Sequence, residues 1–234
     1  MIYSSLIIVF LVIALSACTS LNQNEMNENP QNASALYSLP DKIDHEKAAK
    51  LNIELGLNYL KQEQITRAKA KLTHAKMLAP QLPEVHYAYG YFLETVGEIE
   101  QAEKSYLKAI SLYPRGGIEH NNYGTFLCRQ GKYRLAEKEF LLAINDPHYL
   151  NTAEALENAG LCVLQVPDSV KAAKYFEKAL RYDPKRVNAL IELATLSCQQ
   201  KNKTLAKAYL ERYLAIAKPT ARTNQLKQQI AESP

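Results

Sequence analysis

The sequence predicts an all-α fold, a right-handed superhelical solenoid built from pairs of helices, and three periodic features support this. Small residues recur at spacings of 34, 34, 36 and 34, at Gly56, Gly90, Gly124, Gly160 and Ala194. Alanines follow each of them twelve residues later, at Ala68, Ala102, Ala136, Ala172 and Ala206. A proline ends each interval, at Pro80, Pro114, Pro147, Pro184 and Pro219. Repeats of 20 to 50 residues are typical of solenoids, in which each unit stacks on its neighbours.

Each interval has the residue chemistry of two closely crossing helices. The small residues let the two helices approach, and bulky residues four after each alanine fill the space between units: Leu72, Tyr106, Phe140, Phe176 and Leu210. Glycine inside a helix costs roughly 1 kcal/mol relative to alanine, which is tolerable where close packing compensates. Proline cannot continue a helix and ends the second one. A 34-residue period of this kind is the signature of the tetratricopeptide repeat.

The first 17 residues are predicted to be a lipoprotein signal peptide. An apolar run of about ten residues ends at Leu15, shorter than the roughly 20 that a bilayer-spanning helix needs. Leu15-Ser16-Ala17-Cys18 resembles the bacterial lipobox, which implies lipidation of Cys18. No basic residue precedes the apolar run, so an uncleaved anchor or an ordinary signal peptide stays an alternative. Thr19 follows the cysteine, where Gram-negative lipoproteins that stay in the inner membrane tend to have Asp. The resemblance to bacterial lipoproteins, with no Asp at this position, therefore implies an outer-membrane location facing the periplasm.

Residues 18–41 are predicted to form a flexible, lipidated tether. They hold too few apolar residues to build a core, and a flexible chain of this length reaches roughly 25–30 Å. All 28 Lys and Arg residues lie after this segment, as do all but three of the 24 acidic residues. The resulting modest positive charge permits an acidic partner or an anionic surface without requiring nucleic acid.

Five tetratricopeptide repeats are expected over residues 42–219, at approximately 49–82, 83–116, 117–152, 153–186 and 187–219. The interval of 36 places two extra residues in the run 146–151, which predicts a longer loop there and a tolerated surface insertion. Residues 220–234 are predicted to be a capping helix and tail. This segment is polar apart from Leu226 and Ile230, as suits the last element of a solenoid.

The sequence contains no recognisable catalytic or metal-binding pattern, which predicts a protein that is not an enzyme and that binds no cofactor, metal or small-molecule substrate. The five histidines form no HExxH or other close pair, and there is no GxSxG or phosphate-binding glycine loop. His86 and His120 each lie four residues before a small residue and are interpreted as packing residues.

The first helices of stacked tetratricopeptide repeats line a concave groove, which is the predicted partner-binding site. Positions three before, one after and four after each small residue are expected to point into it. The candidate positions are Leu57, Leu60, Tyr87, Tyr91, Glu94, Asn121, Thr125, Glu157 and Leu161. Tyr87 and Tyr91 lie one turn apart and could anchor an amphipathic helix or an extended apolar segment. Alternatively, some of these side chains pack on neighbouring repeats.

Three cysteines other than Cys18 lie in the first helices of successive units, at Cys128, Cys162 and Cys198. Because neighbouring first helices lie side by side, a Cys128–Cys162 disulfide is feasible, and an oxidising periplasm would form it. Pairing of Cys162 with Cys198, or three buried thiols, are the alternatives. The spacings do not fit a metal site.

Two runs go beyond the general repeat pattern, HNNYGTFLCRQG at residues 120–131 and NAGLC at residues 158–162. Together with the lipobox and the number of repeats, they resemble the type IV pilus biogenesis lipoproteins of the PilF/PilW type, called pilotins. The resemblance implies an outer-membrane lipoprotein that promotes localisation and multimerisation of the secretin, and so supports pilus biogenesis and twitching motility. It also implies that Cys128 and Cys162 are paired. The alternative is a periplasmic adaptor lipoprotein for peptidoglycan hydrolases or outer-membrane assembly.

Overall fold

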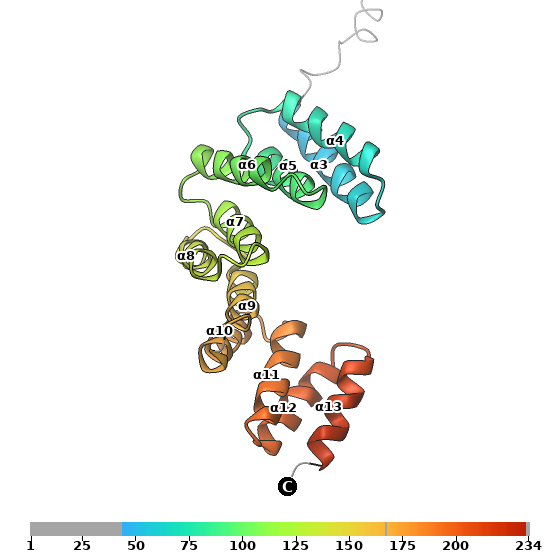
Figure 1. Ribbon diagram of the computed structural model, residues 1–234, viewed down its shortest axis with the longest axis vertical. Coiled ribbons are helices and arrows are strands. Elements are labelled where there is room, and N and C mark those ends of the chain that lie inside the picture. The colour runs from blue at the N-terminus through green and yellow to red at the C-terminus, as the bar shows by residue number, and fades with distance from the viewer. Residues whose placement is uncertain (1–43, 167, 233–234) are drawn as a thin grey trace, which may run out of the picture. The chain divides into compact units, whose positions relative to one another are not determined.

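The computed structural model describes residues 44–166 and 168–232, and within them the chain forms eleven helices and no strand (Figure 1). The predicted all-α repeat fold is therefore confirmed. The predicted signal peptide, Cys18 and the tether lie outside the described residues. None of the described helices combines the length and the apolar character that crossing a membrane requires.

The helices follow one another in antiparallel pairs along the chain. The pairs are α3 (His45–Lys61) with α4 (Ile65–Leu78), α5 (Pro83–Thr95) with α6 (Ile99–Leu112), α7 (Gly117–Arg129) with α8 (Tyr133–Ile144), α9 (Thr152–Val163) with α10 (Ser169–Tyr182), and α11 (Val187–Gln199) with α12 (Lys203–Leu214). A last helix, α13 (Ala221–Glu232), packs on α11 and α12. Each first helix also contacts the first helix of the next pair, so α3, α5, α7, α9 and α11 make a continuous row.

The helices of a pair approach closely because glycine lies at the crossing. A Cβ atom added to Gly160 would lie 2.6 Å from the ring of Phe176, and one added to Gly124 would lie 2.9 Å from the ring of Phe140. Both rings are buried. The bulky residue of each second helix was expected to fill the space between units. In these two pairs it also packs directly against the glycine of its own unit.

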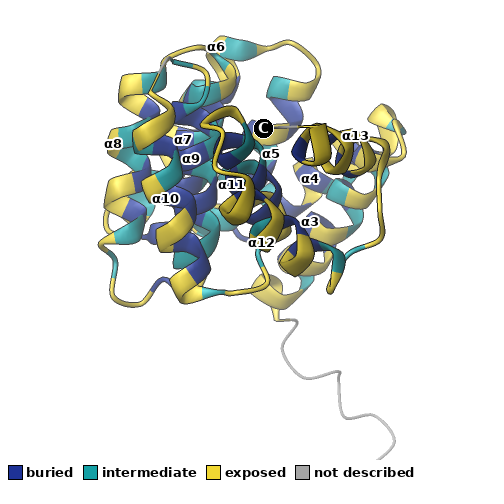
Figure 2. Cartoon of the chain, turned by 90° about the horizontal axis from the view of Figure 1, so that it is seen from below, coloured by how far each residue is buried: buried dark blue, intermediate teal, exposed yellow. Residues whose placement is uncertain are grey.

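The core runs between the helices along the whole stack. Buried residues gather on the facing sides of the helices, and exposed residues cover the outer sides (Figure 2). Leu226 and Ile230 of α13 are both buried in this core, so the last helix covers the apolar end of the α11–α12 pair. His86 and His120 are buried as well, and each has its Nε2 close to a proline carbonyl oxygen, at 2.8 Å from Pro80 and 3.0 Å from Pro114.

Candidate functional site

The structure divides the nine predicted groove positions into three groups by exposure. Tyr91 is the exposed residue among the nine, with 42% of its surface accessible to solvent. Five are half-buried: Leu57, Tyr87, Glu94, Thr125 and Leu161. Three are buried: Leu60, Asn121 and Glu157. The surface available to a partner is therefore narrower than the sequence predicts.

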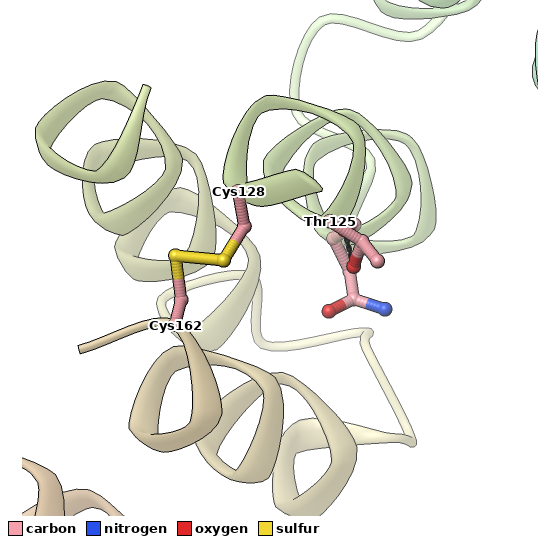
Figure 3. Close-up of a disulfide and its surroundings, with 4 residues drawn as sticks. Thr125, Cys128 and Cys162 are labelled. Atoms are coloured by element: carbon pink, nitrogen blue, oxygen red, sulfur yellow. Dashed lines mark hydrogen bonds between the residues drawn. A yellow bond between two sulfur atoms is a disulfide. The ribbon is translucent and has the colours of Figure 1, made fainter. Parts of the chain in front are cut away.

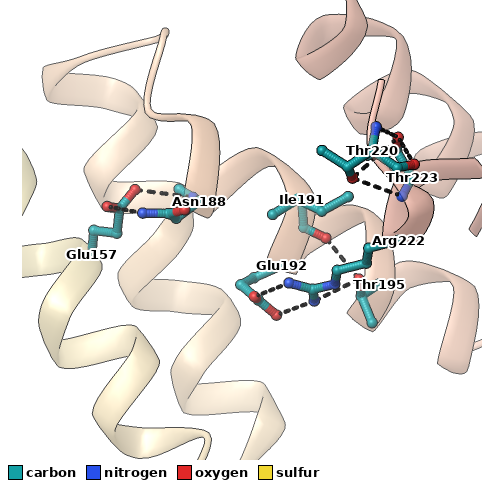
Figure 4. Close-up of polar contacts among 9 residues, drawn as sticks. Glu157, Asn188, Ile191, Glu192, Thr195, Thr220, Arg222 and Thr223 are labelled. Atoms are coloured by element: carbon teal, nitrogen blue, oxygen red, sulfur yellow. Dashed lines mark hydrogen bonds and ion pairs between the residues drawn. The ribbon is translucent and has the colours of Figure 1, made fainter. Parts of the chain in front are cut away.

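Glu157 differs most clearly from its predicted position in the partner-binding groove. It is only 2% exposed, and its carboxylate accepts hydrogen bonds from Arg186 Nη2 at 2.6 Å, Asn188 Nδ2 at 3.0 Å and the Ala189 amide at 3.0 Å. Figure 4 shows Glu157 and Asn188 facing each other across the two helices. The prediction that Glu157 binds a partner is wrong, because its carboxylate joins α9 to the start of α11.

Asn121 and Leu60 are also corrected, because neither is presented at the surface. The Asn121 Oδ1 accepts a hydrogen bond from Asn158 Nδ2 at 3.1 Å, and its carbonyl oxygen accepts one from Thr125 Oγ1 at 2.8 Å. Leu60 is buried in the hydrophobic core. Tyr87 is half-buried against the same core, and burial raises the pKa of its hydroxyl well above the ordinary value.

The structure joins Cys128 of α7 to Cys162 of α9 by a disulfide, with their Cα atoms 5.7 Å apart (Figure 3). The bond links the first helices of two successive pairs. Cys198, the partner in the alternative pairing, is a free and half-buried thiol. The disulfide therefore fixes the part of the first-helix row where α7 meets α9.

A cavity of about 350 Å³ opens beside this disulfide. The predicted groove residues Thr125 and Leu161 line it, together with Arg129 and Asn158. Arg129 was not among the predicted site residues. It lies five residues after Gly124, outside the three repeat positions expected to face the groove, and the repeat pattern carries no signal for it.

Arg129 connects the cavity to the exposed Tyr91. Its Nε and Nη2 each donate to one oxygen of the Glu94 carboxylate at 2.6 Å, and its guanidinium lies 5.7 Å from the centre of the Tyr91 ring. Tyr106 also donates to Glu94, at 3.2 Å. Glu94 is thus occupied by partners within the chain, while the Tyr91 ring and part of the guanidinium stay open to solvent.

We call Tyr91, Thr125, Arg129, Asn158 and Leu161, with the adjoining disulfide, the central surface. It offers an aromatic ring, an aliphatic side chain, a hydroxyl, an amide and one cation. Such a mixture suits recognition of a polypeptide segment, because aromatic and arginine side chains provide much of the binding energy at protein interfaces. Within the described residues no group of three or more His, Cys, Asp or Glu side chains could hold a metal ion.

Comparison with known proteins gives matches to the tetratricopeptide repeat at residues 83–115 and 168–230. The type IV pilus assembly protein PilF of Pseudomonas aeruginosa is 28% identical over 159 residues, which is 68% of this chain and 63% of the relative. This chain therefore spans less than two thirds of the length of that curated relative.

Two solved structures share the arrangement of helices. The structure described as "Functional Characterization of Pseudomonas Aeruginosa pilF" has 30% sequence identity and a TM-score of 0.72, and the match covers 80% of this chain and 85% of that one. The structure of PilW, described as a widely conserved type IV pilus biogenesis factor, has 23% identity and a TM-score of 0.69, with 79% and 85% covered. At 23% identity, the similarity to PilW supports the assignment of the fold of this chain.

Proposed function

This chain belongs to the PilF- and PilW-type tetratricopeptide repeat proteins of type IV pilus biogenesis, and we propose that it acts as a pilotin. In this role it promotes the localisation of the pilus secretin to the outer membrane and its assembly into multimers. The observation that carries the proposal is the similarity to PilF, which extends over 80% of this chain in structure.

The central surface supports a binding role in this function. The disulfide holds α7 and α9 together, so Arg129, Thr125 and Leu161 keep fixed relative positions beside the cavity. A surface that is ordered before binding loses less conformational entropy on association. We propose that an apolar or amphipathic segment of the secretin subunit lies on this surface, with an apolar side chain against Leu161 and Tyr91.

Lipidation at Cys18 would place the repeats at the inner face of the outer membrane. The predicted tether of residues 18–41 would let them reach secretin subunits near that membrane without releasing them. Confinement of both partners raises their effective concentration, which favours association without any additional contact. The role is that of a scaffold, in which the repeats bind subunits and carry out no covalent step.

The experiment is to measure secretin multimers in outer-membrane fractions of a strain that lacks this gene. We expect the multimers and surface pili to be lost, and both to return with the wild-type gene. Cys18→Ala should move the protein out of the outer-membrane fraction and lower the yield of multimers. Normal multimers in the deletion strain would refute the proposal, and an altered cell shape with intact multimers would favour the peptidoglycan adaptor.

A second experiment tests the central surface. The double variant Tyr91→Ala/Arg129→Ala should lower capture of secretin by the purified full chain by about tenfold, since the loss of an aromatic and an arginine contact commonly costs more than 1 kcal/mol. Tyr182→Ala is the matched control, because Tyr182 is an exposed tyrosine on the second helix α10. Equal capture by the double variant would place the secretin elsewhere on the protein.

A further inference from the structure

The loop predicted as a tolerated insertion forms one side of a second cavity, of about 590 Å³. This cavity lies where α5 and α7 begin and α6 ends, and its lining includes Glu84, Tyr113, Ile118, Glu119, Asp146 and Leu150. We call it the acidic pocket. It shares no lining residue with the central surface.

The loop that closes the acidic pocket is held in place by its own contacts. Asp146 accepts hydrogen bonds from the Gly117 amide at 2.8 Å and from the His148 amide at 2.9 Å. Tyr149 is buried against the start of α7, where a Cβ atom on Gly117 would lie 2.5 Å from its side chain. The two extra residues therefore belong to an ordered wall that is attached to the start of α7, in the pair of helices that precedes the loop.

The charge inside the acidic pocket is one-sided. Three carboxylates line it, at Glu84, Glu119 and Asp146, and no Lys or Arg is present among its described lining residues. The single lining histidine, His148, is largely exposed and lies 3.6 Å from Asp146. Glu84 has a distant ion pair with the exposed Lys50, at 4.0 Å. Such a surface pair is screened by water and contributes little.

Glu119 is the most deeply buried of the three acidic residues that line the acidic pocket. It is 4% exposed, its carboxylate interacts with its own backbone amide, and its neighbours in the pocket, Glu84 and Asp146, carry the same charge. An acidic residue in the first turn of a helix is stabilised by the helix dipole, which lowers its pKa. Here burial is the largest effect and raises the pKa of Glu119, and the neighbouring Glu84 and Asp146 raise it further, against the opposing effects of its own backbone amide and of His120. The helix start alone therefore does not account for a carboxyl group at this position.

We infer that the acidic pocket binds a basic side chain of a partner polypeptide, with the cationic head at Glu119. The exposed side chains of Ile118 and Leu150 would pack along its aliphatic stem, and the exposed ring of Tyr113 would lie near its head. A bare divalent cation is a poorer fit, because no metal-holding cluster exists among the described residues. Residues 18–41 contain no Lys or Arg and so offer no such side chain. This inference does not depend on the pilotin proposal.

The test is a titration of the full chain in detergent with Nα-acetyl-arginine methylamide, followed by backbone amide NMR. We expect shifts at residues 117–119 and 148–150. The citrulline analogue has the same shape without the charge and should bind about tenfold more weakly, the factor that corresponds to 1.4 kcal/mol. Equal binding of the citrulline analogue would overturn the inference. Binding of putrescine at least as tight as that of the arginine probe would assign the pocket to free polyamines and overturn it too.

Two variants separate a binding role from a structural one. Glu119→Gln keeps the shape of the side chain and should weaken binding of the arginine probe by about tenfold. Glu154→Gln is the matched control, because Glu154 is likewise the third residue of a first helix and does not line the pocket. Tyr113→Leu should weaken binding of the arginine probe without changing the helical content of the protein. Unchanged binding in both Glu119→Gln and Tyr113→Leu, or stronger shifts with inorganic phosphate, would refute the inference.

Discussion

Arg186 Nη2 lies 2.6 Å from Glu157 Oε1, so that an arginine before one first helix binds a carboxylate on the preceding first helix. Arginines at other positions also bind a glutamate on the preceding first helix. Arg222 of α13 binds both oxygens of Glu192 on α11 at 2.7 and 2.8 Å (Figure 4), and Arg129 of α7 binds Glu94 of α5. These arginine–glutamate contacts join neighbouring units, whereas glycine packing joins the two helices within a unit.

Glu157→Ala should lower the free energy of unfolding by about 3 kcal/mol, because it removes the partner of a partly buried arginine and four hydrogen bonds. The measurement is urea unfolding followed by circular dichroism. Glu211→Ala is the control, since the Glu211–Lys207 pair is exposed and should contribute less than about 1 kcal/mol. Because interfaces between repeats act locally, hydrogen exchange should rise most in α11. Equal effects of the two variants would contradict this role for Glu157.

Removal of the Cys128–Cys162 disulfide should also destabilise the chain. The two cysteines are 34 residues apart, and the chain-entropy model gives about 3.8 kcal/mol for closing a loop of that size. We expect Cys128→Ser/Cys162→Ser to unfold at lower urea, with no further change on addition of dithiothreitol. Cys198→Ser should unfold at nearly the same urea concentration as the wild type and keep its response to dithiothreitol. A wild-type protein that does not respond to the reductant would show that the bond is absent.

The fold was predictable because its main determinant is steric and repeats along the chain. Gly124 and Gly160 must be small because Phe140 and Phe176 lie against them. Gly56 and Gly90 have the same relationship to Leu72 and Tyr106, and its recurrence gives a period that a single sequence reveals. A repeat pattern averages over units, however. It therefore carries little information on contacts that occur in one unit alone.

The candidate site was predictable only in part for that reason. The repeat pattern places Tyr91 and Glu157 on first helices, yet their exposure depends on residues of the next unit, Arg129 and Arg186. The buried carboxylate of Glu157 is paired with an arginine 29 residues later in the chain. The acidic pocket was missed because it depends on the hydrogen bond between Asp146 and Gly117, and the sequence shows only that the loop is two residues longer.

The pKa values of His86 and His120 should shift in opposite directions, although the two histidines occupy equivalent positions in two repeats. His120 Nδ1 lies 2.7 Å from Glu139 Oε2 and its Nε2 faces the Pro114 carbonyl, so both ring nitrogens can donate only in the imidazolium form. The hydrogen bond to Glu139 raises the pKa of His120. His86 lacks such a carboxylate, and burial lowers its pKa. NMR titration of the imidazole protons should place the two values on either side of 6.5.

The raised pKa of His120 makes stability depend on pH. Its contribution is fully present below the unfolded pKa of about 6.5 and is lost as the pH rises through the folded value. Glu139→Gln should therefore lower the free energy of unfolding by about 1.5 to 3 kcal/mol at pH 6, the range for hydrogen bonds to charged groups, and by less at pH 9. Urea unfolding at both values measures this. A difference between wild type and variant that stays constant with pH would exclude the imidazolium as its source.

Alanine should be tolerated at Gly90 better than at Gly160, although both glycines lie in first helices. At Gly160 the new Cβ would lie 2.6 Å from the buried ring of Phe176, so we expect a loss of about 1 to 3 kcal/mol from overpacking, in spite of the roughly 1 kcal/mol that alanine gains in helix propensity. At Gly90 the nearest atoms, on Ser105 and Tyr106, lie 3.3 Å away. Small shifts relieve that contact, and Gly90→Ala should stay within about 1 kcal/mol of the wild type. The measurement is the urea midpoint of each variant. A larger loss of stability in Gly90→Ala than in Gly160→Ala would contradict the close approach of α9 and α10.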